Sequence, residues 1–169
     1  MKYAILVFVM STALFAQEKN PITAAARDVV MPRVKNLVAA AETMPADKYA
    51  YNPTPAQSTF GHLIMHAVRA NDLLCAKISG TEAPKVDIKE TDPKDKLVAA
   101  LKDSASYCDT ALTKATDSHL DEVLTVFGEH KMSRAAVMME FSADAADHYA
   151  TAAMYLRLNG LLPPTAKKP

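Results

Sequence analysis

Two polar residues interrupt an apolar helical pattern near the C-terminal end of the chain. Asp144 and His148 are four residues apart, so on a helix their side chains project from one face about one turn from each other. The positions that continue this face are apolar or aromatic: Val137, Phe141, Ala152 and Tyr155. Burying a polar group without a partner costs about 2–7 kcal/mol, and a charge costs more. A divalent metal is a natural way to compensate that cost.

A third metal ligand must come from another helix. His62 and His66 lie four residues apart in a second helical segment. His66 continues the apolar face of that segment, whereas His62 lies near its start, where it would face water. We therefore expect His66 to join Asp144 and His148. Two alternatives stay open: the histidines are hydrogen-bonded core residues, or the carboxylate pairs with Arg69, Arg134 or Arg157.

The other histidines are expected on the surface or in loops. They are His119 and His130. His130 is the one that a loop could bring near the proposed site.

Four long helical segments are expected to position these residues. Their approximate bounds are 22–44, 59–79, 92–114 and 133–159. The expected N-caps are Ser58, Asp92 and Ser133, and the expected stops are Gly80 and Gly160. Residues 116–131 are less regular, and residues 123–127 are compatible with a loop, a short helical turn or a strand. Four amphipathic helices of similar length predict an all-α protein that forms a four-helix bundle.

The first sixteen residues are typical of a secretory signal peptide. Lys2 precedes an apolar run over residues 4–14, and Ala16 is a small residue at a suitable cleavage position. The run is too short to span a membrane stably. We expect residues 17–164 to form one domain and residues 165–169 a frayed tail. The sequence thus predicts an exported protein, periplasmic or secreted, without stable membrane insertion; an uncleaved N-terminal helix or anchor is the alternative.

The charge balance argues against nucleic acid as a partner. The chain has 19 Lys and Arg and 19 Asp and Glu, and they are scattered along it. It has no phosphate-binding glycine loop, no flavin or nicotinamide fingerprint and no Ser/His/Asp or Cys/His signature. A small-molecule substrate is therefore the expected partner. Alanine-rich faces at residues 24–26 and 39–41 also leave room for a homodimer.

The two cysteines test the direction of the two middle helices. Cys75 and Cys108 lie at similar depths, roughly 15–17 residues into their helices. Parallel helices would bring them to the same level, where a disulfide can form. Antiparallel helices would separate them by roughly 15 Å, beyond the limit of about 7 Å between Cα atoms. Both a disulfide and two separate buried thiols stay open.

Motifs spread over nearly the whole mature chain resemble those of a known family. They are MPADKY at 44–49, PTP at 53–55, STFG at 58–61 with Leu63 and His66, His148-Tyr149, and YLRLNG at 155–160 with Pro163-Pro164. In this order and at these spacings, they resemble the DinB family. The resemblance implies a four-helix bundle with a long crossover connection.

The resemblance also implies a divalent metal bound by three histidines, one from the second helix and two from the fourth. His66 matches the first position and His148 the last, whereas Asp144 stands where the middle histidine is expected. Two imidazoles with one carboxylate suit zinc first, with nickel, manganese and iron as alternatives.

The resemblance implies a thiol-dependent transferase or isomerase, although many relatives have no assigned reaction. A divalent metal with three protein ligands can also lower the pKa of a bound water. We therefore expect a metal-dependent hydrolase or thiol transferase of unknown substrate. Tyr149 and Tyr155 are the candidate catalytic hydroxyls near the metal. Low-molecular-weight thiols are scarce outside the cytoplasm, which favours hydrolysis or plain metal binding over thiol transfer. The alternative is a non-enzymatic module that binds a small ligand or a partner on the same four-helix scaffold.

Overall fold

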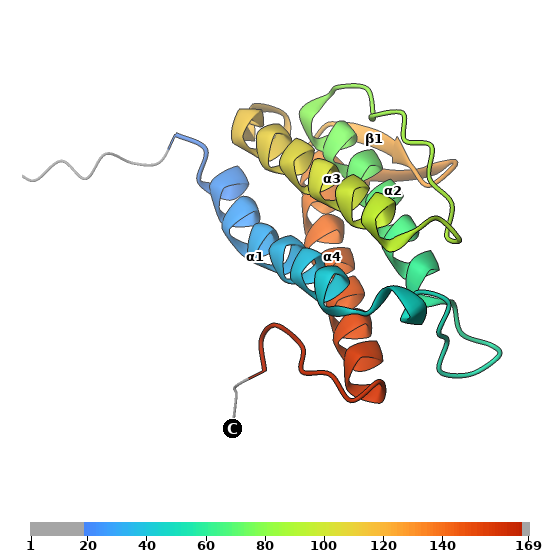
Figure 1. The fold of residues 1–169 in the computed structure, drawn as a ribbon. Coiled ribbons are helices and arrows are strands. Elements are labelled where there is room, and N and C mark those ends of the chain that lie inside the picture. Colours follow the sequence, from blue (N-terminus) through green and yellow to red (C-terminus); the bar gives the residue numbers. More distant parts are fainter. Residues whose placement is uncertain (1–18, 167–169) are drawn as a thin grey trace, which may run out of the picture.

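Four helices form a bundle in the computed structural model, which describes residues 19–166 (Figure 1). The elements are α1 (Pro21–Thr43), η1 (Ala46–Lys48), α2 (Phe60–Ser79), α3 (Lys94–Lys114), η2 (Asp117–His119), β1 (Val123–Val126), β2 (His130–Ser133) and α4 (Arg134–Leu158). The predicted all-α four-helix bundle is confirmed, with one small hairpin added. The predicted signal peptide lies outside the described residues and stays a prediction. Of the helices described, none is long and apolar enough to cross a membrane.

The two middle helices, α2 and α3, run parallel. Their contacts advance in the same direction along both, because Ser104 reaches the Val68 carbonyl while Cys108 is bonded to Cys75 further along. The Cα atoms of this disulfide are 5.2 Å apart. A parallel pair requires the chain to return between the helices, and residues 81–91 make that long crossover. The structure therefore contains the disulfide that the sequence left open.

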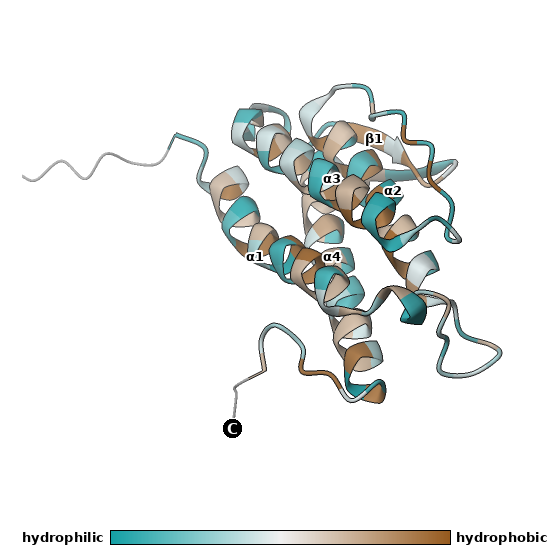
Figure 2. Cartoon of the chain, viewed as in Figure 1, coloured by the Kyte–Doolittle hydropathy of each residue, from teal (hydrophilic) through white to brown (hydrophobic). Residues whose placement is uncertain are grey.

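Apolar side chains fill the bundle in two clusters. One joins the last turns of α1 and α4 to the start of α2 and α3, and the other joins the opposite halves of the helices. Their largest fully buried members include Phe60, Leu37 and Met44 in the first cluster, and Phe141, Leu74 and Ile78 in the second. The hydropathy colouring shows apolar and polar segments alternating along each helix (Figure 2). Burial of the apolar side chains between the helices is what holds the bundle together.

The helix caps differ from the prediction at two of three starts. Ser133 caps α4 as predicted, since its hydroxyl accepts a hydrogen bond from the Ala136 amide. The prediction of Ser58 for α2 is wrong, because Thr59 is the cap there and accepts from the His62 amide at 3.0 Å.

The prediction of Asp92 as the cap of α3 is also wrong. Pro93 occupies the cap position. The Asp92 carboxylate turns back and accepts from the Lys89 amide at 2.8 Å, and it pairs with Lys96 at 2.8 Å. It thereby closes the end of the crossover instead of capping the helix.

Thr59→Ala is expected to lower the free energy of unfolding by about 1 kcal/mol, because it removes the hydroxyl that caps α2. Ser58→Ala is the matched control and should change stability little, since the neighbouring serine is not the cap. Urea denaturation of the two variants measures the difference. Equal losses, or a larger loss for Ser58→Ala, would contradict the cap assignment.

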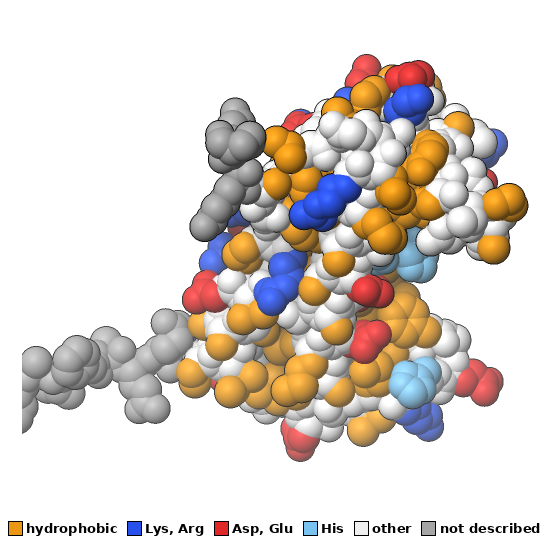
Figure 3. Space-filling model, turned by 90° about the horizontal axis from the view of Figure 1, so that it is seen from below, with side chains coloured by type: hydrophobic (Ala, Val, Ile, Leu, Met, Phe, Trp, Pro, Cys, Tyr) orange, Lys and Arg blue, Asp and Glu red, His pale blue; other side chains and the backbone are white. Residues whose placement is uncertain are grey.

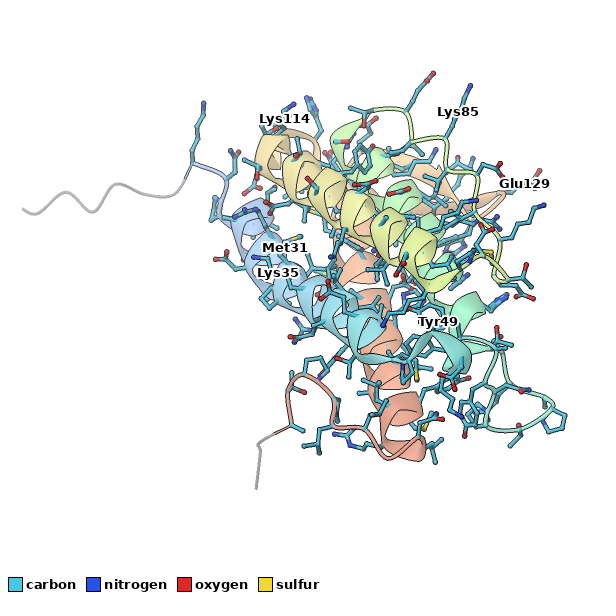
Figure 4. All side chains as sticks on the ribbon, in the orientation of Figure 1. Met31, Lys35, Tyr49, Lys85, Lys114 and Glu129 are labelled. Atoms are coloured by element: carbon cyan, nitrogen blue, oxygen red, sulfur yellow. A yellow bond between two sulfur atoms is a disulfide. The ribbon has the colours of Figure 1, made fainter. Side chains whose placement is uncertain are left out.

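The irregular segment between α3 and α4 contains the hairpin. β1 and β2 are antiparallel, and Val126 pairs with His130 across the turn. Phe127 and Gly128 have φ of 47° and 83°, the left-handed backbone that a tight turn requires. Glu129 completes the turn at the outer tip of the hairpin (Figure 4). Of the three alternatives for residues 123–127, the strand is the one observed.

Gly61 marks a close approach between the start of α2 and the end of the crossover. Its amide donates to the Tyr49 carbonyl at 2.8 Å, and a Cβ atom there would overlap the carbonyl oxygen of Glu90. Tyr49 lies where the chain passes from α1 towards α2 (Figure 4).

Gly61→Ala is expected to lower the free energy of unfolding by about 1–3 kcal/mol, because the added methyl group must displace backbone. Helix propensity acts in the opposite direction by about 1 kcal/mol, so a purely local effect would stabilise the protein. Thermal denaturation distinguishes the two, and a raised Tm would contradict the close contact.

Candidate metal centre

Helices α2 and α4 carry the three predicted ligands to facing positions. His66 lies in the second turn of α2, and Asp144 and His148 lie in the middle of α4. The α4 face predicted from spacing is confirmed, because its apolar and aromatic members are buried: Val137, Phe141, Ala152 and Tyr155. His148 is buried among them with 7% of its surface exposed.

The three side chains converge. One potential ligand atom from each of His66, Asp144 and His148 lies within 4.8 Å of the other two. Asp144 Oδ2 lies 3.4 Å from His148 Nδ1. The rings of His66 and His148 are nearly perpendicular, with centroids 5.2 Å apart. The group that the sequence predicted from two separate helices is therefore assembled, and its donor atoms could hold a divalent metal.

Two buried atoms of this group have no hydrogen-bond partner within residues 19–166: Asp144 Oδ2 and His148 Nδ1. They approach each other, yet their geometry does not make a hydrogen bond. Leaving such atoms unpaired is costly, and a cation between them would satisfy both lone pairs. The residues present therefore fit a metal.

The arginine alternative is not observed for Asp144. No arginine in the described part of the chain lies within ion-pair distance of this carboxylate. Arg69 donates to the Ile88 carbonyl, and Arg134 donates to the Lys77 carbonyl and pairs with Glu122.

His66 is more exposed than the sequence predicted. The apolar face of α2 that includes His66 is predicted to point inward, but the His66 side chain lies at the surface of the bundle. An ion at about 2.0–2.2 Å from each ligand requires their atoms to lie within about 4 Å of one another. The observed 4.8 Å is wider. An exposed imidazole can change rotamer at little cost, so His66 is the ligand free to close that distance.

Burial sets the protonation of the α4 pair. It raises the pKa of Asp144 above its usual range, and the nearby His148 and His66 oppose this shift. Burial also lowers the pKa of His148, against the opposing charge of Asp144. The neutral imidazole that results is the form that binds a metal.

A pocket of about 370 Å³ adjoins His66. Its polar lining comes from α2, α4 and the loop before α2: Gln57, Ser58, His62, His66, Thr151 and Tyr155. The Tyr155 hydroxyl donates to the Ser58 carbonyl at 2.7 Å. Tyr149 lies elsewhere, since its hydroxyl accepts from the Thr165 amide at 3.1 Å. In the view from below, histidine side chains reach the surface beside apolar ones (Figure 3).

His62, which lines this pocket, pairs with Glu90 in a contact that the sequence did not predict. His62 Nδ1 lies 2.5 Å from Glu90 Oε2, and the His62 ring stacks parallel to His66 with centroids 6.2 Å apart. Glu90 belongs to the crossover, and no spacing rule connects it with a helix face. His119 and His130 are exposed, as predicted, and neither belongs to the ligand group within the described chain.

Comparisons with known proteins agree with this architecture. The family model of the DinB superfamily matches residues 33–152. A DinB-like protein from Bacillus subtilis has a similar crystal structure, with a TM-score of 0.66 and 18% identity over 80% of this chain and 92% of that one. A conserved protein from Enterococcus faecalis has a TM-score of 0.62 and 14% identity over 80% of this chain and 95% of that one. At these identities the likeness concerns the fold. No curated protein matches the sequence.

Proposed function

Because the chain belongs to the DinB superfamily, we propose that it is a metal-dependent hydrolase that acts on a small molecule. His66, Asp144 and His148 hold one divalent metal, with zinc as the first expectation and nickel, manganese or iron as alternatives. The observation that carries the proposal is the pair of buried, unpartnered ligand atoms on Asp144 and His148, with a nitrogen of His66 within 4.8 Å, in the part of the chain described.

The bound metal would supply Lewis acidity, which polarises a carbonyl or phosphoryl group and promotes attack by water. The chain's own residues do the rest. His66 links the ligand group to the pocket, so the substrate approaches from that side. Glu90 binds Nδ1 of His62 and so orients the imidazole ring. This leaves Nε2 of His62 to contact the substrate.

Tyr155 is the better placed of the two predicted catalytic tyrosines. It lines the pocket, and its hydrogen bond to the Ser58 carbonyl fixes the ring on the loop before α2. Its role is to orient a polar group of the substrate. The catalytic role predicted for Tyr149 stays a prediction, with its hydroxyl bound to Thr165.

The proposed location is outside the cytoplasm, periplasmic or secreted. Two independent features support it. The N-terminal residues follow the pattern of a signal peptide. The Cys75–Cys108 disulfide is a bond that persists in oxidising compartments and is rare in the cytosol. This location favours hydrolysis over thiol transfer.

The test is metal-dependent turnover. Purified protein is stripped of metal, reconstituted separately with zinc, nickel, manganese and iron, and assayed on a panel of small esters, amides and phosphoesters, with and without a low-molecular-weight thiol. We expect turnover that needs both metal and His148, is unchanged in His119→Ala and does not need thiol. Turnover only with thiol would favour the transferase. Stoichiometric metal without turnover would exclude the panel's reactions, and no metal uptake would overturn the proposal.

A binding module is the second candidate, and a separate groove favours it. The groove measures about 260 Å³, lies between the first halves of α1 and α4 and has an almost wholly apolar lining: Ile22, Ala25, Val29, Ala135, Met138 and Met139. Ile22, Val29 and Met139 are among the most exposed large apolar residues described. Binding of an apolar probe by metal-free protein would support this candidate.

A further inference from the structure

A second pocket lies beneath the crossover, and the ligand group of the metal centre takes no part in it. It measures about 410 Å³ and lies between residues 84–88 of the crossover and the facing sides of α2 and α3. Lys85 marks this stretch of the chain (Figure 4). The crossover passes over the helices here as an extended strap (Figure 1).

Both ends of this strap are fixed. At one end, Arg69 donates to the Ile88 carbonyl at 2.9 Å, and the Ile88 side chain is buried with 3% of its surface exposed. At the other end, the Tyr107 hydroxyl bonds the Thr81 hydroxyl at 2.8 Å and donates to the Glu82 carbonyl at 3.2 Å. The strap is thus held in place over the pocket, which is partly open to solvent.

The floor of the pocket carries a buried carboxylate. Asp72 is 4% exposed and Ser104 beside it 3% exposed. Asp72 Oδ1 is buried and has no hydrogen-bond partner among the residues that the structure describes. Burial raises the pKa of Asp72, the nearby Ser104 hydroxyl lowers it, and the negative charge of Asp103 raises it. A buried carboxylate in this state is stabilised when a cation reaches it.

The charges around the pocket are unbalanced towards the negative. Asp87 and Asp103 line it together with Asp72, against Lys85 and Lys96. The Lys96 ammonium is already paired, 2.8 Å from Asp92 on the turn before α3. Counting only partners among residues 19–166, the pocket therefore offers three carboxylates against one lysine that has no ion-pair partner.

A metal ion does not suit this pocket as well as an organic cation does. Within the described residues, the only group of three converging metal-ligating side chains is the one at His66. The carboxylates of this pocket are spread over its floor and rim, and its walls are apolar, with contributions from Val86, Ile88 and Ala100. An elongated molecule with an ammonium group and an apolar body matches both features.

We propose that the pocket beneath the crossover binds a small aliphatic amine, whose ammonium group donates to the Asp72 carboxylate while its alkyl chain packs against Val86 and Ile88. Asp87 and Asp103 attract the cation at the rim. The site is independent of the metal centre, so it holds whether or not the hydrolase proposal does.

The test is a titration of metal-free protein with n-butylammonium chloride, followed by NMR chemical shifts, with butanol as the uncharged probe. Wild type is expected to bind the ammonium saturably in the millimolar range, the affinity typical of so few heavy atoms, and butanol much more weakly. Asp72→Asn should weaken binding about tenfold or more, because it removes a charge-assisted hydrogen bond. Asp121→Asn removes an exposed carboxylate outside the pocket and should bind like wild type.

A variant that leaves the buried carboxylate intact guards against misfolding of Asp72→Asn. Ala99→Leu adds bulk to a lining residue on the exposed side of α3 and should also weaken binding, while the thermal transition stays cooperative. Absence of saturable binding to wild type would overturn the proposal. Equal binding by wild type and a folded Asp72→Asn would also overturn it. The same holds if the NMR chemical-shift changes are confined to residues outside α2, α3 and the strap.

Discussion

His148→Ala is expected to lower the affinity for zinc by more than about 100-fold, because even changes to groups that only support a ligand cost about 10–100-fold. His148 is the most buried of the three ligands, and Asp144 Oδ2 lies 3.4 Å from its Nδ1. Removing the imidazole leaves a carboxylate from the same helix and one exposed histidine from another. Competition with a fluorescent chelator measures the affinity.

Two variants serve as controls for this result. His119→Ala removes an exposed histidine outside the ligand group and should bind zinc like wild type. Asp144→His installs the middle histidine that the family resemblance implies, and it should retain zinc binding. If the zinc affinity of His148→Ala stays within about threefold of wild type, the metal binds elsewhere. Such a difference is well below the roughly 1.4 kcal/mol that corresponds to a factor of ten.

Loss of the disulfide is expected to produce the largest change in stability. The bond joins Cys75 to Cys108 across 33 residues, a segment that includes the whole crossover. Closing a loop of this length lowers the entropy of the unfolded chain and stabilises the fold by about 3–4 kcal/mol. The Cys75→Ala/Cys108→Ala double variant should therefore unfold at a lower urea concentration than oxidised wild type. Its free energy of unfolding should be lower by about 3–4 kcal/mol.

The reduced wild-type protein is the matched control for the double variant. Because both lack the cross-link, they should show similar unfolding free energies, and both should fall below oxidised wild type. Equal stability of the oxidised protein and the double variant would contradict a bond that constrains the crossover.

The helices were predictable because their start and stop signals are local. Ser133 caps α4, and Gly80 ends α2 with φ of 70°, as the sequence indicated. Asp92 failed as a cap because its carboxylate had two competing partners, the Lys89 amide and Lys96, that a cap rule does not consider. The hairpin was uncertain because four-residue strands carry too little pattern to separate them from a turn.

The site was predictable only in part. The spacing of Asp144 and His148 fixed their common face, since positions four apart on a helix are neighbours. The choice of His66 over His62 followed the same rule. The apolar positions that flank His66 on α2 nevertheless predicted more burial of its side chain than the structure shows. Glu90 could not be predicted, because its approach to His62 depends on the path of the crossover over the start of α2. The pairing of the cysteines depended likewise on helix direction, which their positions tested but did not determine.

Anomalous diffraction at the zinc edge, from crystals of the protein grown with zinc, tests the central claim most directly. We expect one strong peak within about 2.0–2.2 Å of a nitrogen of His66, an oxygen of Asp144 and a nitrogen of His148. The His66 side chain should have closed the 4.8 Å spread between ligand atoms to about 4 Å or less. A zinc peak held by other residues, or none at this trio when zinc is in excess, would contradict the metal centre.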